Sequence, residues 1–325
     1  MKSEFDFVVL GAGAIGSILA AHLARADHSV AVIARGHRAA YIQKSGLQIS
    51  GLAEFTVPVQ VLTDPLQLER CAVLIVATKA IGTAGTLAPL RHVRVETALS
   101  IQNGTLKDDL LASAFGKACV LGSLADVSGE LLDSGQVLFT RNVNLLLGEI
   151  SGDMSERARS IAAAIDGAGV RATAVDNIVS LEWSKLVAWA ALLLVAVTTR
   201  SVTWKYLCDA NAAEMMVRIV REVSQLTSAL NIELTDQAVL PVATLCQGAE
   251  ADAVQRLINV GQQFAAYAPG HKMSGLQDLE AGRSLELAET LGETLNRAER
   301  LGLQLPLVSV MYRLAETIDR LRRMP

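Results

Sequence analysis

Aromatic residues, charged residues and cysteines are all scarce in this sequence of 325 residues. Aromatic residues make up 4% of the chain and charged residues 19%, whereas hydrophobic residues reach 51%. This balance provides enough apolar surface for a packed core and excludes an intrinsically disordered chain. Because the apolar content is mostly Ala, Leu and Val, the composition also favours a helix-rich protein.

Long hydrophobic runs are missing as well. The longest strongly apolar run without a charge, Leu186–Val197, spans about a dozen residues, which is short of the ~18–20 residues needed to cross a bilayer. We therefore interpret it as a buried helix. The first residues show no basic start followed by a long apolar stretch, so no signal peptide is expected. We expect a cytoplasmic protein without a membrane partner.

Several kinds of site are excluded by missing motifs. The four cysteines lie far apart and form no C-x-x-C pair, so neither a zinc site nor a disulfide framework is expected. The net charge is −4 and no long basic run occurs, which argues against nucleic acid as a partner. No H-E-x-x-H, Walker A or G-x-S-x-G motif is present, and no metal site is predicted.

The first half of the chain alternates between strand-like and helix-like segments. Residues 73–77 form a continuous apolar run, as in a strand buried on both faces of a parallel sheet. The repeated strand–helix–strand order predicts an α/β fold with a doubly wound sheet. Strands are expected at 5–10, 29–34, 73–77, 97–101 and 118–122, helices at 14–26, 37–45 and 155–167, and a small antiparallel piece at 134–148.

The second half is helical throughout. Helices are expected at 177–197, 209–230, 236–247, 250–264, 284–301 and 307–323. The last of these carries one apolar face, formed by Leu307, Val310, Met311, Leu314, Ile318 and Leu321. We therefore predict two domains, a Rossmann-type domain over residues 1–176 and an all-α domain over residues 177–325.

A glycine-rich motif follows the first predicted strand and opens the first predicted helix. Gly11 allows a tight turn, Gly13 lets the backbone approach a pyrophosphate, and Gly16 lets the helix pack closely on the strand. The N-terminus of the helix faces the bound anion. The motif, Gly11-Ala12-Gly13-Ala14-Ile15-Gly16, therefore predicts a dinucleotide site.

The end of the second predicted strand indicates which dinucleotide binds. An NAD site usually has Asp or Glu there, but residues 28–34 are followed by Arg35 and no carboxylate. A guanidinium can hold a 2′-phosphate through charge-assisted hydrogen bonds. The pattern favours NADPH/NADP over NAD. FAD is disfavoured because the helical half offers no evident cradle for its ring system.

Three further polar residues stand at positions where a site is expected. Lys79 and Asn103 follow two predicted strands at the carboxyl edge of the sheet, where open α/β sheets bind ligands. The alternatives are a solvated lysine and an Asn-Gly turn. Lys185 directly precedes the apolar run 186–197 of the most apolar helix, where partial desolvation suits a lysine to acid–base catalysis. The alternative is a helix-end lysine whose ammonium reaches water.

Taken together and in order, these motifs resemble the ketopantoate reductase (2-dehydropantoate 2-reductase) family over nearly the whole chain. Besides the glycine motif and Arg35, the resemblance rests on Thr78-Lys79-Ala80, Gln102-Asn103-Gly104, Trp183-x-Lys185-Leu186 and the segment from Met273-Ser274 to Glu286. For the cofactor, it implies that Arg35 and Lys79 contact the 2′-phosphate end of NADPH. Asn103 would lie beside the nicotinamide ribose and the substrate.

The resemblance also implies roles in catalysis. Lys185 would donate a proton to the substrate carbonyl as hydride arrives from the nicotinamide. A nearby ammonium both stabilises and protonates the oxygen on which charge develops. Ser274 would hydrogen-bond the substrate carboxylate, and Glu286 would bind the ribose or orient the ammonium.

The sequence departs from the family at two positions. The family carries asparagines four and eight residues after the lysine, where this chain has Trp189 and Leu193. Without these amides the helix lacks two hydrogen-bond partners for a substrate hydroxyl. We therefore expect that the substrate bound beside Trp189 and Leu193 is a 2-oxo acid other than ketopantoate. His271 and Lys272 could supply a cation for a carboxylate, or be solvated loop residues.

The leading hypothesis is an NADPH-dependent reductase of a small 2-oxo acid. One alternative is ketopantoate reductase proper, which acts in pantothenate synthesis. Another is a non-catalytic NADP(H)-binding sensor, although a pure binder needs no proton donor at Lys185. The only partner predicted is the small-molecule substrate, and the apolar helical half leaves a homodimer open.

Overall fold

The computed structural model describes residues 3–324. The chain divides into two compact units, residues 1–179 and 180–325. The sequence pattern placed the change from α/β to all-α at about residue 176, and in the structure the last strand ends at Ala174. Each unit is described separately below.

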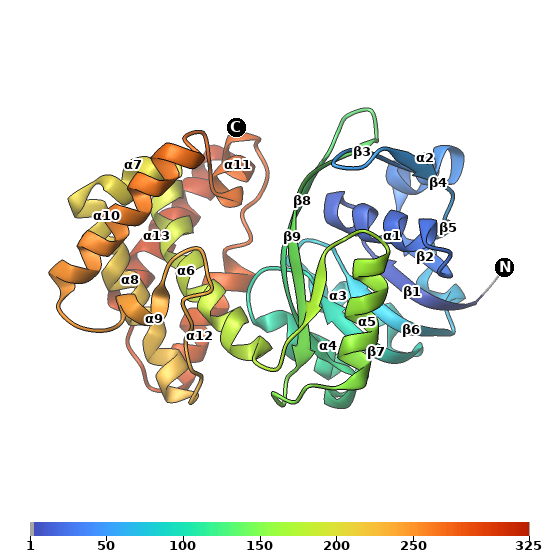
Figure 1. Ribbon diagram of the computed structural model, residues 1–325, viewed down its shortest axis with the longest axis horizontal. Coiled ribbons are helices and arrows are strands. Elements are labelled where there is room, and N and C mark those ends of the chain that lie inside the picture. The colour runs from blue at the N-terminus through green and yellow to red at the C-terminus, as the bar shows by residue number, and fades with distance from the viewer. Residues whose placement is uncertain (1–2, 325) are drawn as a thin grey trace. The chain divides into compact units, whose positions relative to one another are not determined.

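A five-stranded parallel sheet forms the centre of the first unit (Figure 1). Its strand order is β5-β2-β1-β6-β7, and each neighbouring pair is parallel. The strands are β1 (Glu4–Leu10), β2 (Val30–Ile33), β5 (Gln60–Leu62), β6 (Arg70–Val76) and β7 (Arg94–Ser100). Leu10 pairs in register with both Ile33 and Val76. The carboxyl ends of β1, β2 and β6 therefore meet at one edge of the sheet.

Helices cover both faces of this sheet, as predicted from its continuous apolar strands. Val9 of β1 packs in one core with Ile18 of α1, and Val8 packs in a second core with Leu87 and Leu111. The helices are α1 (Ala14–Arg25), α2 (Gly36–Ser45), α3 (Thr83–Leu87) and α4 (Leu106–Phe115), with short 3₁₀ turns at Pro65–Gln67, Ala88–Leu90 and Lys117–Cys119.

A second sheet packs on α1 and was only partly predicted. Its strands are β3 (Leu47–Gly51), β4 (Phe55–Val57), β8 (Leu121–Leu131), β9 (Val137–Glu149) and β10 (Ala172–Ala174). Its order is β10-β9-β3-β4, and β8 pairs antiparallel with β9. The small antiparallel piece expected at 134–148 is thus one arm of a long hairpin. Helix α5 (Glu156–Gly167) follows, and Ser155 caps it, because its hydroxyl accepts from Ala158 N at 3.1 Å.

The strand expected at 118–122 was wrong in both its start and its sheet. Residues 117–119 form a 3₁₀ turn, and the strand begins at Leu121. A single bridge between Ala98 and Val120 touches the parallel sheet. The physical reason is that the hairpin partner β9 pairs with residues 121–131 along their whole length and draws them into the second sheet.

His22 of α1 is buried between the two sheets of this unit. Its Nδ1 lies 2.9 Å from the carbonyl oxygen of Ala168, and its ring makes edge contacts with Phe55 and Phe139. Burial lowers the pKa of His22, because a charged imidazolium would lose its hydration there. The folded state therefore holds this histidine neutral.

Acid should consequently destabilise the protein through His22. Below its ordinary pKa of 6.5 the unfolded histidine gains a proton that the folded one does not, so the free energy of unfolding falls as pH drops, by at most about 1.4 kcal/mol per pH unit. Urea unfolding at several pH values should show a shallower dependence for His22→Gln than for the wild type. His37→Gln, at an exposed position, serves as the control. Equal slopes for the wild type and His22→Gln would contradict this expectation.

The second unit is built from helices. They are α6 (Ile178–Thr199), α7 (Thr203–Cys208), α8 (Ala210–Ala229), α9 (Val242–Leu245), α10 (Glu250–Tyr267), α11 (Ser274–Glu280), a π turn at Ala288–Gly292, α12 (Glu293–Arg300) and α13 (Pro306–Arg322). Helix α6 is long and apolar enough to cross a membrane by length and composition alone. However, 78% of its most apolar 18-residue window is buried inside the structure, as in a core helix.

Several helix predictions in this unit need correction. The helix expected at 236–247 shrinks to Val242–Leu245, because Pro241 has no N–H to donate and the Asp236 carboxylate accepts from Thr244 N at 3.0 Å. The helix expected at 284–301 begins only at Ala288. Helices α7 and α11 were not predicted, because six or seven residues are too few to show a helical period.

Only one of the six residues of the apolar face predicted on the last helix, Met311, is buried. The buried residues of α13 are Val308, Met311, Ala315 and Asp319, while Val310, Leu314 and Leu321 are 64%, 46% and 57% exposed. Arg322 joins this side of the helix to the segment that begins in α11, since it donates to the carbonyl oxygens of Leu279 at 2.8 Å and of Arg283 at 2.6 Å. The Asp319 carboxylate accepts from Arg322 and Arg323 at 2.8 Å each, so its buried charge is paired.

Candidate functional site

The glycine motif forms a tight loop between β1 and α1. Gly11 has a φ of +105°, and a Cβ there would lie 2.7 Å from Thr78 Cγ2. A Cβ at Gly16 would lie 2.1 Å from the Gly11 carbonyl oxygen, so neither position accepts a side chain. By contrast, no atom lies within 4 Å of the Cβ position of Gly13. The loop is therefore tightly packed on one side and open at Gly13.

The N-terminus of α1 is left available to an anion. Gly13 is the N-cap residue, and no side-chain cap bonds the first turn, which also carries no acidic residue. The carbonyl oxygen of Ala12 is occupied elsewhere, since it accepts from Ser17 Oγ at 3.1 Å and from Arg38 Nε at 2.9 Å. Uncapped N–H groups and the helix dipole suit a phosphate. The loop therefore fits the pyrophosphate of a dinucleotide.

Arg38 holds the glycine loop in place, a role that sequence reasoning missed. Besides Ala12, its guanidinium donates to Ser17 Oγ at 2.8 Å and to the carbonyl oxygen of Gly135 at 2.5 Å. Its burial lowers the pKa of the guanidinium from the ordinary value. These partners lie up to 97 residues away in the chain, so no local pattern could have indicated them.

Arg35 stands at the end of β2, as the sequence indicated. It is exposed and occupies the N-cap position of α2, whose first turn has no acidic residue. Gly36 follows with a φ of +55° and no atom within 4 Å of its Cβ position. A guanidinium beside an uncapped helix N-terminus suits a second phosphate.

Gln102 ties the ends of β6 and β7 together. Its amide Nε2 lies 3.0 Å from the carbonyl oxygen of Lys79 and 2.8 Å from Thr83 Oγ1, and its Oε1 accepts from Ser100 Oγ at 3.1 Å. The loops that carry Lys79 and Asn103 are thereby held next to each other. Since β1, β2, β6 and β7 end at one edge, the predicted cofactor residues of this unit gather there.

In the helical unit, α6 carries three of the predicted residues. Lys185, Trp189 and Leu193 recur every four residues and so share one side of the helix. Lys185 and Trp189 are partly buried. Leu193 is only 2% exposed, and a Cβ at Gly275 would lie 2.1 Å from its Cδ1. Leu193 is therefore a packing residue that seats α11 against α6.

This packing places Ser274 near the Lys185 side of α6. Ser274 is the first residue of α11, is exposed, and directly precedes Gly275. The close approach of Leu193 to Gly275 leaves no room for a side chain between the two helices. Ser274 therefore lies next to the contact between α11 and Leu193, two helical turns along α6 from Lys185.

Trp189 has an unusual polar environment. Its indole Nε1 is buried, yet no acceptor among residues 3–324 pairs with it. Buried donors almost always have a partner, because losing hydration without one is unfavourable. The unpaired donor lies on the same side of α6 as Lys185.

Glu286 lies in the segment between α11 and the π turn and is partly buried. The end of α13 braces this segment, since Arg322 donates to the carbonyl oxygens of Leu279 at 2.8 Å and of Arg283 at 2.6 Å. Arg283 also pairs with Asp278 at 2.6 Å. The loop that carries Glu286 is therefore fixed by backbone contacts.

His271 and Lys272, the alternative source of a cation, are engaged within their own unit. His271 Nδ1 lies 2.8 Å from Thr203 Oγ1, and Lys272 Nζ lies 2.7 Å from a carboxylate oxygen of Glu280. These contacts join the loop to α7 and to α11. Within residues 3–324, no group of three or more His, Cys, Asp or Glu side chains is placed to hold a metal ion.

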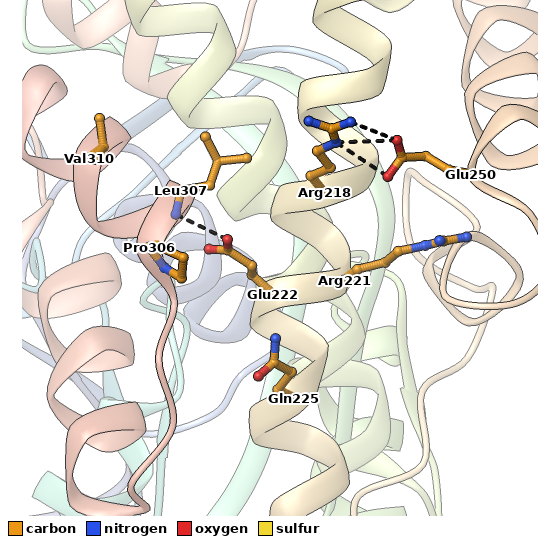
Figure 2. A pocket seen from close by; sticks show the side chains of 8 residues that line it. All are labelled: Arg218, Arg221, Glu222, Gln225, Glu250, Pro306, Leu307 and Val310. Atoms are coloured by element: carbon orange, nitrogen blue, oxygen red, sulfur yellow. Dashed lines mark hydrogen bonds and ion pairs between the residues drawn. The ribbon is translucent and has the colours of Figure 1, made fainter.

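A separate groove runs between α8 and α13 (Figure 2). In it Arg218 pairs with Glu250, and the Glu222 carboxylate accepts from the backbone N–H groups of Leu307 and Val308 at 3.0 and 2.9 Å. Glu222 thus caps α13, whose own N-cap residue Leu305 cannot. None of the residues predicted for the site lines this groove, and its charged groups are paired.

Known proteins similar to this chain share both of its parts. Residues 7–152 match the family described as ketopantoate reductase PanE/ApbA, and residues 177–319 match the C-terminal part of the same family. A 2-dehydropantoate 2-reductase of Archaeoglobus fulgidus is 26% identical over 311 residues, which cover 96% of this chain and 97% of that protein. One of Mesorhizobium japonicum is 28% identical over 308 residues, covering 86% and 87%.

Solved structures show the same fold. A 2-dehydropantoate 2-reductase from Methylococcus capsulatus has a TM-score of 0.80 at 25% identity, covering 98% of each chain. A ternary complex of D-mandelate dehydrogenase with NADH and anilino(oxo)acetate has a TM-score of 0.82 at 18% identity, covering 98% of this chain and 100% of that one. The expected α/β architecture with a helical second part is confirmed. With both parts of the family matched in order, the chain belongs to the ketopantoate reductase PanE/ApbA family.

Proposed function

We propose that the protein is an NADPH-dependent reductase that transfers hydride to the carbonyl group of a small 2-oxo acid. The observation that carries this proposal is the family match over both parts of the chain. The resemblance in sequence motifs supports it by implying that Lys185 is the proton donor. The relatives named as 2-dehydropantoate 2-reductases support the reaction class.

The first unit fits the cofactor. The open space at Gly13 and the uncapped start of α1 would receive the pyrophosphate. Arg35 and Lys79 would bind the 2′-phosphate end, and Asn103 would contact the nicotinamide ribose. When bound, the reduced nicotinamide supplies the hydride.

The helical unit would supply the remaining chemistry. Lys185 donates a proton from its Nζ to the substrate carbonyl oxygen, where negative charge develops during reduction. The Ser274 hydroxyl donates to the substrate carboxylate. Glu286 binds the ribose or orients the Lys185 ammonium, and the braced backbone of its loop favours a fixed position.

Loss of NADPH absorbance in the presence of a panel of 2-oxo acids, including ketopantoate, tests the proposal. Turnover of at least one acid with NADPH is expected. Tight NADPH binding without turnover of any acid would instead support the alternative of a non-catalytic NADP(H)-binding sensor.

Ketopantoate itself should be a poor substrate. Because Trp189 and Leu193 replace two amides, the substrate hydroxyl is expected to remain unpaired on α6, which lowers kcat/KM by roughly 10–100-fold relative to an unhydroxylated 2-oxo acid of similar size. The measurement compares kcat/KM for both substrates in the wild type and in Trp189→Asn. The difference in kcat/KM between the two substrates should be smaller in the variant. A wild type that prefers ketopantoate, with no gain in the variant, would refute this interpretation.

A further inference from the structure

We propose that the protein forms a symmetric dimer in which α13 of one copy packs antiparallel against α13 of a second copy. The exposed apolar end of each helix would lie in the groove between α8 and α13 of the other copy. This inference goes beyond the proposed function, because it depends neither on the reaction nor on its substrate.

The first observation is an apolar stripe along the outside of α13. Its members recur every three or four residues and continue just beyond the end of the helix: Leu307, Val310, Leu314, Thr317, Leu321 and Met324. This spacing is the a/d pattern of a helix that packs against another helix. However, Val310, Leu314, Leu321 and Met324 are all exposed. The part of the chain that the structure describes therefore leaves the stripe uncovered.

The second observation is the groove beside the first turn of the same helix (Figure 2). Leu307 and Val310 of α13 line one wall, and Arg218 and Gln225 of α8 line the other. The Arg218 guanidinium is held by Glu250 at 3.0 Å, so its aliphatic stem is left to contact apolar atoms. The groove therefore offers a surface for apolar side chains at the end of α13 opposite to Leu321.

A two-fold axis relates these two ends of α13. In an antiparallel pair with its axis near Ala315, Val310 of one copy packs near Leu321 of the other. Leu307 of one copy likewise lies near Met324 of the other, so the exposed C-terminal side chains enter the groove. Each contact occurs twice, because a two-fold interface uses the same patch on both copies. The helix thus carries both halves of a self-complementary contact.

The exposed charges beside the stripe fit the same arrangement. Arg313 and Glu316 are both exposed and lie next to each other on one flank of α13. With the axis near Ala315, Arg313 of each copy lies within one turn of Glu316 of the other. Opposite charges in this position favour the antiparallel register more than they add to affinity.

The size of the contact predicts a weak dimer. The stripe from Leu307 to Met324 is about 25 Å long and one helix diameter, about 10 Å, wide. Two such strips with interdigitated side chains bury on the order of 1,000 Å² in total, at the low end for specific protein interfaces. We therefore expect a dissociation constant on the order of micromolar rather than nanomolar.

Sedimentation of the full chain from low to high micromolar concentration tests the dimer. The wild type should change from monomer to dimer over this range. Leu321→Asp places a charge in the contact and should remain a monomer, and Leu314→Asp repeats the test at a second exposed position. Val239→Asp is the matched control, because Val239 and Leu321 are each 57% exposed, and it should dimerise like the wild type. A wild type that stays monomeric throughout, or aspartate variants of α13 that dimerise equally well, would overturn the proposal.

Charge reversal tests the register. Arg313→Glu brings like charges together across the axis and should weaken dimerisation severalfold. The double variant Arg313→Glu/Glu316→Arg restores opposite charges and should recover the affinity of the wild type. If the double variant associates no better than Arg313→Glu, the antiparallel register is refuted.

Cross-linking tests the direction of the helices. Oxidation of a mixture of the Val310→Cys and Leu321→Cys proteins should give a disulfide-linked dimer that neither variant forms alone. The wild type, which has four cysteines of its own, is the control. Equal cross-linking of Val310→Cys alone would place the two N-terminal ends together and refute the antiparallel pair.

Discussion

Lys185→Ala is expected to lower kcat by about 10²–10⁴-fold, the usual contribution of general acid catalysis, while NADPH binding stays largely intact. The reason is that the lysine would serve the substrate carbonyl and lies on α6, whereas the glycine loop proposed to bind the pyrophosphate lies in the other unit. Single-turnover absorbance of NADPH measures the chemical step, and calorimetry measures binding of the cofactor.

Lys79→Ala provides the contrasting variant for this experiment. Lys79 is exposed at the end of β6, and we expect its loss to weaken NADPH binding with a smaller effect on kcat at saturating cofactor. If Lys185→Ala retains kcat within a few-fold of the wild type on the best substrate, Lys185 is not the proton donor.

Arg35→Ala should weaken NADPH binding by about 10–100-fold, the loss expected for charge-assisted hydrogen bonds to a phosphate, and hardly change NADH binding. NADH has no 2′-phosphate, so the exposed guanidinium at the end of β2 has nothing comparable to hold. Calorimetric titration gives, for each cofactor, the ratio of the dissociation constants of the variant and the wild type. Equal affinity of the wild type for NADPH and NADH would refute the assignment.

Arg38→Ala separates this effect from a general disturbance of the loop. Arg38 donates to the carbonyl oxygens of Ala12 and Gly135 and to Ser17, so its loss loosens the glycine loop that both cofactors share. The binding of NADPH and the binding of NADH should then weaken by a similar factor. The two arginines lie three residues apart, but their variants should differ in how they change NADPH and NADH binding. Arg35 faces solvent, whereas Arg38 holds the glycine loop through hydrogen bonds.

The features that sequence alone predicted correctly are those with a local signature. The continuous apolar run of β6 indicated a strand buried on both faces, and the structure shows it as an inner strand of a sheet covered by helices. Gly11 and Gly16 indicated a tight loop, because only glycine tolerates the positive φ found at Gly11 and the close backbone approach found at Gly16. Arg35, Lys79 and Asn103 could be grouped because parallel strands end at the same edge.

Helical spacing likewise predicted the shared side of Lys185, Trp189 and Leu193, but not what each side chain does there. Leu193 was expected to face a substrate and instead packs on Gly275. The unpaired N–H of Trp189 depends on which acceptors surround it. A helical period specifies a direction from the axis, whereas the neighbours in that direction come from other parts of the chain.

The amino-acid sequence by itself determined the parallel sheet, the glycine loop, the helical second part and the side of α6 that carries Lys185, since each follows from residues close together in the chain. Other features were decided only by the tertiary structure. They are the hydrogen bonds of Arg38 to the glycine loop, those of Gln102 between the ends of β6 and β7, the packing of α11 on Leu193 and the buried face of α13. Arg322 shows the reason most clearly: it donates to the carbonyl oxygens of Leu279 and Arg283, which lie in a distant segment, while Leu314 and Leu321 of the same helix stay outside. Such contacts join distant segments or override hydrophobic periodicity, so no local pattern encodes them.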